Sequence, residues 1–296
     1  MANIATSAEA ENAQKIMVAA TRYVQEHKAP AYQLIEKMKL PKGHKSAEVP
    51  KVGQFEFSNL ADGQDMNEDQ TINIQTTNLT TREVGAKVIV SDKLLRQNAS
   101  TSIFSIVGRQ AGDGFARKQD NDVTALYTAL NGGTKFGEAG KNFTLANAAA
   151  CIIKARGGTA EGQTEPFDPT YIVMHPHNFF NLLSSVSVVG GGTNATPDGL
   201  QTAALKNFFR HRFNGVNFFE DGNLTIDSSD DVIGVLAQKD ALVALESKSF
   251  AIERERDASR RAWELNWVAD YNVFELDDQH GAPLIYDASA PTDTAA

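Results

Sequence analysis

The sequence lacks the features that mark secreted, membrane-spanning and nucleic-acid-binding proteins. Its single cysteine, Cys151, excludes an intramolecular disulfide framework and is typical of a reducing compartment. No window approaches the roughly 18 uninterrupted apolar residues of a transmembrane helix, so no contact with a membrane is predicted. The segment from Met1 to Ile4 lacks the basic and then apolar order of a signal peptide. A net charge of −9 argues against general binding of nucleic acid, which needs a concentrated basic surface.

Clusters of catalytic or metal-binding residues are scarce as well. His175 and His177 could bind a metal from a strand, but Pro176 breaks the strand and no Cys or carboxylate follows at ligand spacing. Cys151 lies on the apolar side of a predicted helix, which favours a buried small residue over a nucleophile. The glycines at 190–192 are not followed by the Lys-Ser or Lys-Thr pair of a phosphate-binding loop. The sequence therefore predicts no catalytic residue, no cofactor and no metal site. A soluble enzyme with a site near His175 and His177 is the least favoured alternative function.

A long helix is predicted from Thr101 to Leu130. Its apolar side chains recur at three- and four-residue steps, as on one face of a helix; they are Ile103, Ile106, Val107, Ala111, Phe115, Val123, Leu126, Tyr127 and Leu130. At 1.5 Å per residue the helix would be roughly 45 Å long. Lys118, Gln119 and Asp120 interrupt the apolar face, and each glycine between residues 108 and 114 costs about 1 kcal/mol relative to alanine. The helix therefore needs a packing partner along its length; an ordinary core helix is the alternative.

A two-stranded ribbon is predicted between residues 52 and 77. Residues 52–60 and 71–77 alternate apolar and polar side chains, and residues 61–69 between them are acidic and polar. Nine residues per strand give an arm of roughly 30 Å, and an isolated hairpin is marginally stable in water. The ribbon is therefore expected to lie on a neighbouring subunit, and a hairpin packed on its own domain is the alternative. Its interface residues would be Phe55, Phe57, Asp62, Asp65, Met66, Glu68, Ile72 and Ile74.

A cluster of mixed charge lies at residues 253–261, between two predicted strands. Because both signs are present, a simple phosphate site is excluded. The cluster is either a solvated hairpin tip or a contact at which copies meet and arginines pair with carboxylates across subunits. The residues of that contact would be Arg254, Glu255, Arg256, Asp257, Arg260 and Arg261.

The rest of the chain mixes helices and strands, which predicts an α+β fold. Residues 1–49 have the pattern of an arm, with a helix at 8–28, a break at Pro30 and a helical turn at 32–38. Residues 1–51 hold eight Lys or Arg and five Glu, a charge of about +3, which leaves about −12 for the remainder. The arm either docks on an acidic neighbour or is a solvated tail. Further helices are expected at 93–97, 145–154, 178–183 and 202–209, and strands at 83–90, 171–174, 216–219, 232–236, 241–245, 250–253, 263–276 and 284–286.

This order of elements resembles the major capsid proteins of tailed double-stranded DNA bacteriophages, which have the Hong Kong 97-type fold. The local matches are residues 81–95, 237–242, 250–257 and 263–271, and the resemblance covers about residues 10 to 288. It implies an arm at 1–49, an extended loop at 50–80, a peripheral domain at 81–139 and 237–282 with the spine helix 101–130, an axial domain at 140–236 and 283–288, and a flexible tail at 289–296. The mixed-charge cluster would then lie near local three-fold axes.

The resemblance implies a structural protein and not an enzyme. Its pentamers and hexamers would close into the icosahedral head shell of a virion, assembled in the host cytoplasm around double-stranded DNA that it does not bind sequence-specifically. Because only about 50 residues precede the ribbon, a separate scaffold protein is expected, with a portal and a maturation protease or decoration proteins as further partners. Residues 55–80 contain no lysine, so the covalent cross-link of some relatives is not expected. An encapsulin-like compartment shell is the alternative on the same fold.

Overall fold

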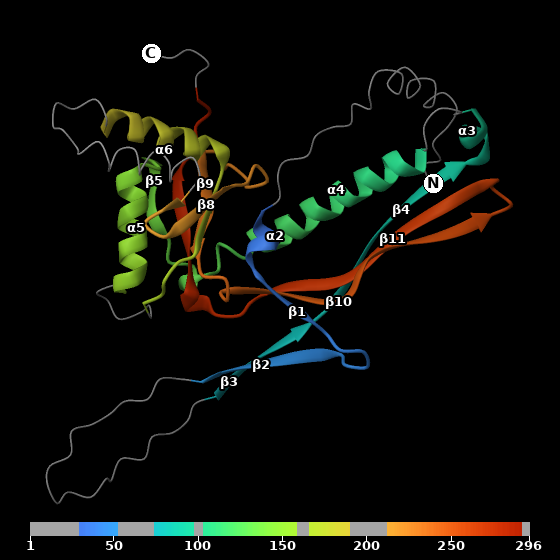
Figure 1. The fold of residues 1–296 in the computed structure, drawn as a ribbon, viewed down its shortest axis with the longest axis horizontal. Coiled ribbons are helices and arrows are strands. Elements are labelled where there is room, and N and C mark those ends of the chain that lie inside the picture. Colours follow the sequence, from blue (N-terminus) through green and yellow to red (C-terminus); the bar gives the residue numbers. More distant parts are fainter. Residues whose placement is uncertain (1–29, 53–73, 98–102, 159–165, 190–211, 292–296) are drawn as a thin grey trace, which may run out of the picture.

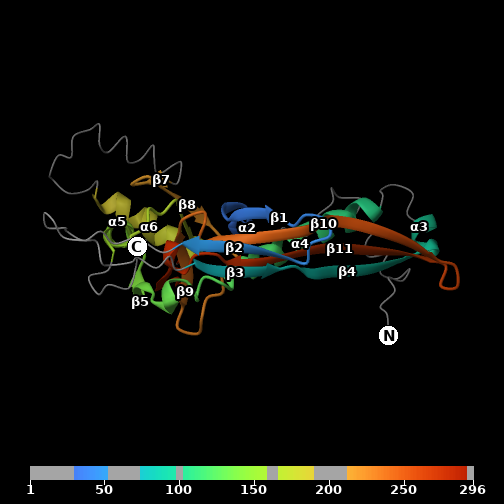
Figure 2. The same ribbon diagram turned by 90° about the horizontal axis from the view of Figure 1, so that it is seen from below.

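Two β-sheets and a projecting ribbon organise the chain. The computed structural model describes residues 30–52, 74–97, 103–158, 166–189 and 212–291. Within these ranges the molecule is thin and elongated, with one sheet at each end and the ribbon pointing away from both (Figures 1 and 2). None of the helices in these ranges is long and apolar enough to cross a membrane.

The first sheet has four strands in the order β1-β10-β11-β4. β1 (Glu36–Lys39) runs parallel to β10 (Leu242–Asp257), whereas β11 (Ala262–Glu275) runs antiparallel to both β10 and β4 (Arg82–Ser91). The alternation predicted for residues 263–276 is confirmed: Leu265 and Trp267 are buried on one face. They form an apolar layer with Val90 and Leu94 beneath Val107 and Ala111 of α4 (Ile103–Thr124).

β10 corrects one prediction, because residues 241–245 and 250–253 are not separate strands. They belong to one strand of 16 residues. The register with β11 shifts between Glu246 and Lys248 and again between Lys248 and Ala251. Such bulges bend a strand without ending it, and the polar residues between the two apolar runs lie at these bulges.

The long helix is shorter than predicted. α4 ends at Thr124, and residues 125–130 form turns that lead into a 3₁₀ helix, η1 (Asn131–Gly133). Tyr127 and Leu130 are nevertheless fully buried, as their apolar periodicity indicated, in the main core of the protein. The apolar pattern therefore predicted burial correctly. The residues after Thr124 do not continue the helix, and Tyr127 and Leu130 pack in a different core from Val107 and Ala111.

The second sheet has six strands in the order β5-β12-β9-β6-β8-β7. Its strands are β5 (Phe136–Asn142), β6 (Tyr171–Met174), β7 (Arg212–Phe213), β8 (Val216–Glu220), β9 (Asp231–Ala237) and β12 (Gly281–Asp287). α5 (Leu145–Gly157) and α6 (Pro176–Val189) pack against it (Figure 1). Thr144 caps α5 by accepting a hydrogen bond from the Asn147 amide, as the sequence predicted. β5 was missed because six of its seven residues are exposed, so it has no apolar alternation.

The structure of residues 30–40 differs from the predicted N-terminal arm. After α2 (Ala31–Leu34), residues 36–39 form strand β1 and not the predicted helical turn. Ala31, Tyr32 and Ile35 are buried in the main core. Residues 30–40 therefore belong to the body of the protein, because burial of these apolar side chains and pairing with β10 outweigh the helical pattern. Residues 1–29, including the predicted helix 8–28, lie outside the described residues, as do 53–73, 98–102, 159–165, 190–211 with the predicted helix 202–209, and 292–296.

The ribbon is formed by β2 (Ser46–Val52) and β3 (Ile74–Thr80). They pair antiparallel from Ser46 opposite Thr80 to Val52 opposite Ile74. The paired part begins before the predicted residue 52, and its base packs through Leu79 against Leu40 and Leu245 of the body.

Candidate assembly surfaces

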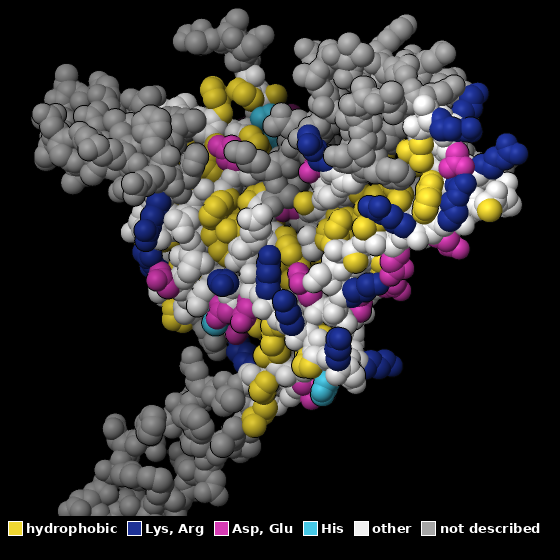
Figure 3. Space-filling model, turned by 45° about the vertical axis from the view of Figure 1, so that its right-hand side comes forward, with side chains coloured by type: hydrophobic (Ala, Val, Ile, Leu, Met, Phe, Trp, Pro, Cys, Tyr) yellow, Lys and Arg dark blue, Asp and Glu magenta, His cyan; other side chains and the backbone are white. Residues whose placement is uncertain are grey.

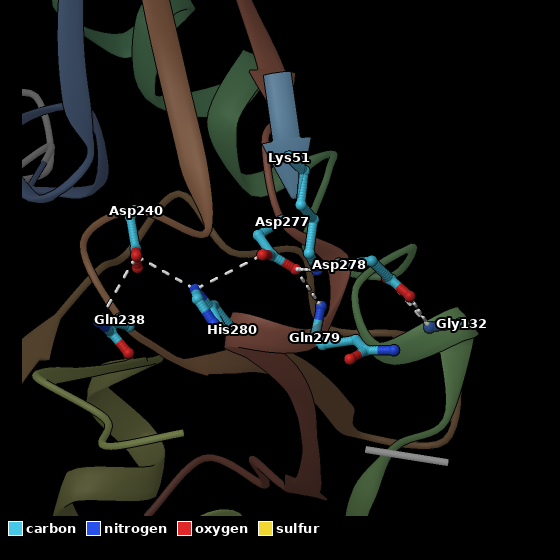
Figure 4. Close-up of polar contacts among 8 residues, drawn as sticks. All are labelled: Lys51, Gly132, Gln238, Asp240, Asp277, Asp278, Gln279 and His280. Atoms are coloured by element: carbon cyan, nitrogen blue, oxygen red, sulfur yellow. Dashed lines mark hydrogen bonds and ion pairs between the residues drawn. The ribbon is translucent and has the colours of Figure 1, made fainter. Parts of the chain in front are cut away.

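A polar cluster fixes the base of the ribbon to the connection between the two sheets (Figure 4). Lys51 lies near the end of the described part of β2, and its Nζ atom is 2.8 Å from Oδ1 of Asp277, between β11 and β12. The Asp277 side chain is only 12% exposed, against 41% for Lys51. A charge on the projecting ribbon is thus paired with a largely buried charge of the body.

The same connection is held by further carboxylates. Asp277 accepts a hydrogen bond from the Gln279 amide, and the His280 ring nitrogen lies 3.1 Å from Asp240. Both carboxylate oxygens of Asp278 accept the amide hydrogen of Gly132 in η1, at 3.0 and 2.9 Å. We call these side chains, together with Lys51, the ribbon-base cluster. It joins the ribbon, η1 and the connection between β11 and β12 at one place.

The ribbon-base cluster has an excess of acidic groups. Partial burial of Glu275, together with its hydrogen bond to Asp278 and the charges of Asp278 and Asp277, raises the pKa of Glu275 to about 7. Lys51 is the cation that offsets this negative charge from the ribbon side. No group of three or more His, Cys, Asp or Glu among the described residues is arranged to hold a metal ion.

The mixed-charge tip of the β10–β11 hairpin is built largely by contacts within the chain. Arg256 donates two hydrogen bonds to the Asp92 carboxylate, at 2.8 and 2.6 Å, and its guanidinium lies 5.4 Å from the centre of the Trp263 ring. Asp257 accepts hydrogen bonds from Ser259 and from the Arg260 amide and so closes the turn. Because these bonds favour the charged carboxylates, they lower the pKa of both Asp92 and Asp257.

These contacts divide five of the six predicted tip residues into two groups. Arg256, Asp257 and Arg260 have ion-pair or hydrogen-bond partners within the chain. The side chains of Glu255 and Arg261 are exposed, and no hydrogen bond or ion pair to them occurs within the described ranges. The tip is thus more than a solvated turn, and whether it meets other copies stays a prediction.

The predicted interface residues of the ribbon are mostly outside the described residues. Phe55, Phe57, Asp62, Asp65, Met66, Glu68 and Ile72 all fall in residues 53–73. Ile74 is described, and 57% of its surface is exposed on β3. An isoleucine exposed to this degree on a projecting ribbon is consistent with a contact made by another copy.

The two histidines of the enzyme alternative have structural contacts. The His177 ring nitrogen Nδ1 is 2.9 Å from the carbonyl oxygen of Ala288, and the His177 amide donates to His175. The pair therefore connects the start of α6 to the end of β12. Cys151 is buried 3.1 Å from the Tyr286 hydroxyl, and burial raises the pKa of its thiol, which disfavours a nucleophilic thiolate.

Sequence reasoning missed a buried pair of carboxyl groups at the junction of the sheets. Asp120 of α4 accepts hydrogen bonds from the Ala31 amide at 2.8 Å and from the Asn223 side chain at 3.0 Å. Asp221, which follows β8, accepts the Asn223 amide hydrogen at 2.8 Å. Both carboxyl groups are fully buried. The only signal in the sequence was that Asp120 interrupts the apolar face of the long helix.

Comparisons with known proteins agree with this architecture. The model of a family described as phage capsid protein matches residues 74–282. None of the curated proteins matches the sequence. The capsid structure of Helicobacter pylori bacteriophage KHP30 is similar over 90% of this chain and 94% of that one, at 11% identity and a TM-score of 0.71.

Two further structures have the same fold at low identity. The capsid of the cyanophage P-SCSP1u is similar over 92% of both chains, with 15% identity and a TM-score of 0.65. The encapsulin of a complex from Synechococcus elongatus is similar over 96% of this chain and 98% of that chain, with 11% identity and a TM-score of 0.60. The predicted α+β fold of the Hong Kong 97 type is confirmed. Since the family match spans most of the chain, this protein belongs to the phage capsid protein family.

Proposed function

We propose that this chain is the major capsid protein of a tailed phage and that its pentamers and hexamers close around double-stranded DNA. Membership of the phage capsid protein family already makes it a structural protein of the capsid shell. The observation that carries the finer proposal is the ribbon. It extends from the body (Figure 1), and an exposed Ile74 lies at the end of its described part, next to the point where Lys51 pairs with Asp277 of the body. A two-stranded ribbon is marginally stable by itself, so its function is to lie on another copy.

The domain assignment is part of this proposal. The extended loop is placed at 50–80, with its paired base starting at Ser46. The peripheral domain is 81–139 with 237–282 and corresponds to the four-stranded sheet and α4, and the axial domain is 140–236 with 283–288 and corresponds to the six-stranded sheet. The positions of β5 and of the start of β12 support boundaries of the axial domain nearer to residues 136 and 281. The tail is placed at 289–296.

Further partners follow from the proposed role. A separate scaffold protein, a portal and a maturation protease or decoration proteins would act on the shell during assembly in the host cytoplasm. The net charge of −9 supports a container that encloses DNA without binding it sequence-specifically. The contacts of His175 and His177 give no support to the enzyme alternative.

The second candidate function is an encapsulin-like compartment, which is favoured by the likeness to the encapsulin complex. The two functions differ in content, since a compartment shell would enclose cargo protein and a phage head would enclose DNA. Shells purified from cells that express this chain with its neighbouring genes would be analysed for nuclease-protected DNA and for enclosed protein. Protected DNA of uniform length supports the capsid proposal, and stoichiometric cargo protein without DNA contradicts it.

Electron microscopy of the purified chain tests assembly directly. We expect capsomer rings or closed polyhedral shells, with a higher yield when a scaffold candidate is co-expressed. A monomer under every condition, concentrated and with the scaffold candidate present, would overturn the proposal.

A deletion tests the ribbon. Removing residues 61–69 is expected to leave a folded, soluble subunit that forms no closed shells. Deletion of residues 292–296 from the tail is the control and should leave assembly intact. Normal shells from the variant lacking 61–69 would contradict the role proposed for the ribbon.

A further inference from the structure

The two faces of the four-stranded sheet differ in what covers them. Trp267 and Leu265 of β11 point toward α4 and pack beneath it. Residues directly opposite one another in neighbouring strands share a face, so Arg254, opposite Leu265, also lies on the α4 side. The residues between these positions point the other way, and no helix among the described residues covers them (Figure 2).

The open face of the sheet is acidic. Glu253 of β10, Asn266 of β11 and Lys87 of β4 are in register on it, as are Glu255 and the largely buried Glu264. Glu83 and Asp270 extend the same face toward the other end of the strands. Lys87 and Lys248 are its basic residues on these strands, and each is already paired, with Glu264 and Glu253 respectively. The open face therefore has a net negative charge.

The α4 side is basic. Arg109 and Arg117 are exposed on α4, and Lys93 and Arg96 are exposed on α3 (Asp92–Gln97). The acids of these helices are Asp92, which binds Arg256, Asp122, which binds Lys118, the buried Asp120, and Asp113, one turn from both Arg109 and Arg117. Arg82 and Arg254 of the sheet add positive charge to this side. Figure 3 shows basic side chains gathered toward the upper right end of the molecule, with acidic ones beneath them.

The two faces point to opposite sides of a thin molecule. In Figure 1 the sheet is seen close to edge-on, with α4 above the strands and the open face below them. A subunit with two different complementary surfaces associates head to tail, and such a contact generates rings when its rotation closes. A shell built from pentamers and hexamers needs this type of contact.

We propose that the basic α4 side of one copy packs against the acidic open face of the next copy within a capsomer. This inference rests on the proposed function, since it names the partner of two surfaces in the shell. Opposite charges at the contact steer encounter and set the register, and like-charged juxtaposition disfavours wrong pairings. The occupant is a second copy because each copy supplies both charges in the same chain. Nucleic acid would meet only the α4 side and would be repelled from the open face.

Charge reversal with rescue tests the proposal. The variant Arg109→Glu/Arg117→Glu reverses two charges of the α4 side, and Glu83→Lys/Glu255→Lys reverses two charges of the open face. Each is expected to lower the yield of capsomers and shells by more than about tenfold, because like charges would then face one another across the contact. The variant with all four substitutions restores opposite charges between neighbours and should recover assembly. The control Arg109→Lys/Arg117→Lys keeps the charge and should assemble normally.

The outcomes separate this inference from the proposed function. If the wild-type chain forms no capsomers, the proposed function fails. If the wild type assembles but the two charge-reversal variants assemble equally well, or the folded four-substitution variant shows no recovery, the proposed contact is wrong. If the Arg109→Glu/Arg117→Glu variant loses both assembly and DNA retention, and the four-substitution variant restores neither, the α4 side binds nucleic acid instead of a second copy.

Cross-linking of the wild type tests the contact without substitutions. A carbodiimide joins lysine amines directly to carboxylates, and assembly from a mixture of isotopically heavy and light copies distinguishes links between copies from links within one. We expect heavy–light links from Lys93 or Lys118 to Glu83, Glu253 or Glu255. Assembled capsomers in which these lysines link only within the chain would overturn the proposal.

Discussion

Asp120 and Asp221 are two fully buried carboxyl groups that meet where α4, α2 and the segment after β8 come together. Burial, and next a hydrogen bond to Asp120, raise the pKa of Asp221 to about 8. At neutral pH Asp221 therefore keeps its proton and donates it toward Asp120. This proton lies at the junction between the four-stranded sheet, the N-terminal segment and the six-stranded sheet.

The substitution Asp221→Asn is expected to reduce the pH dependence of stability. Because the pKa is raised on folding, the folded state binds more protons than the unfolded state, and stability falls from about pH 4 to about pH 8. One such group contributes a slope of at most about 1.4 kcal/mol per pH unit. Asparagine keeps a donor toward Asp120 without a titrating proton, so the variant should gain stability relative to wild type as the pH rises. Urea unfolding at a series of pH values measures this, and parallel curves for the two proteins would contradict it.

The sequence predicted features that depend on local pattern and missed those that depend on tertiary contacts. The cap at Thr144 and the alternation at Trp263, Leu265 and Trp267 required only neighbouring residues, and both are confirmed. Tyr127 was predicted to be buried but not to lie beyond the end of α4. Periodicity shows that a side chain is buried and does not show against which sheet.

The candidate site was harder to predict for the same reason. Arg256 and Asp92 are 164 residues apart in the chain, and Lys51 and Asp277 are 226 apart. No local spacing connects them, so the mixed-charge run 253–261 indicated an unusual segment without its partners. The strand at 36–39 was missed because its partner, β10, is more than two hundred residues away.

Two glycine substitutions are expected to have opposite effects on stability. Gly112 is inside α4 and a Cβ atom there would meet nothing within 4 Å, so Gly112→Ala should raise the free energy of unfolding by about 1 kcal/mol. At Gly234 of β9 a Cβ atom would lie 2.3 Å from both the Met174 sulfur and the Val173 carbonyl oxygen. Gly234→Ala should therefore destabilise the subunit by about 1–3 kcal/mol or more. Denaturant midpoints at an unchanged slope measure both effects, and equal effects would contradict the packing described for these positions.

Arg256→Lys is expected to loosen the β10–β11 tip although the charge is kept. Lysine cannot make the two parallel hydrogen bonds to Asp92 or stack its head group on Trp263 as a planar guanidinium does. Amide hydrogen exchange of residues 92–97 should become faster, and the pKa of Asp92 should rise toward its ordinary value because its main hydrogen-bond partner is weakened. Arg254→Lys, two residues earlier on the same face, is the control. Equal exchange in the two variants would show that Arg256 does not anchor α3.

Lys51→Met is expected to loosen the ribbon without unfolding the subunit. The Lys51 end of the ion pair with Asp277 is 41% exposed and therefore screened by solvent, so the loss of the pair should change the free energy of unfolding by about 1 kcal/mol. The direction of the ribbon should change more, because Lys51 is the charged contact from the ribbon to the ribbon-base cluster and its loss leaves the carboxylates of that cluster without their cation.

Distances between spin labels on Glu48→Cys in β2 and Lys141→Cys in β5 measure the ribbon direction in the monomer. We expect a broader distance distribution in the Lys51→Met variant and a lower yield of shells, because a ribbon that samples many directions loses more entropy when it docks on a neighbour. Lys45→Met, an exposed lysine in the turn before β2, removes the same charge outside the cluster and should leave both measurements at their wild-type values. A narrow distribution in Lys51→Met together with normal shells would show that strand pairing alone, from Ser46 to Val52, sets the ribbon direction and that the cluster has another role.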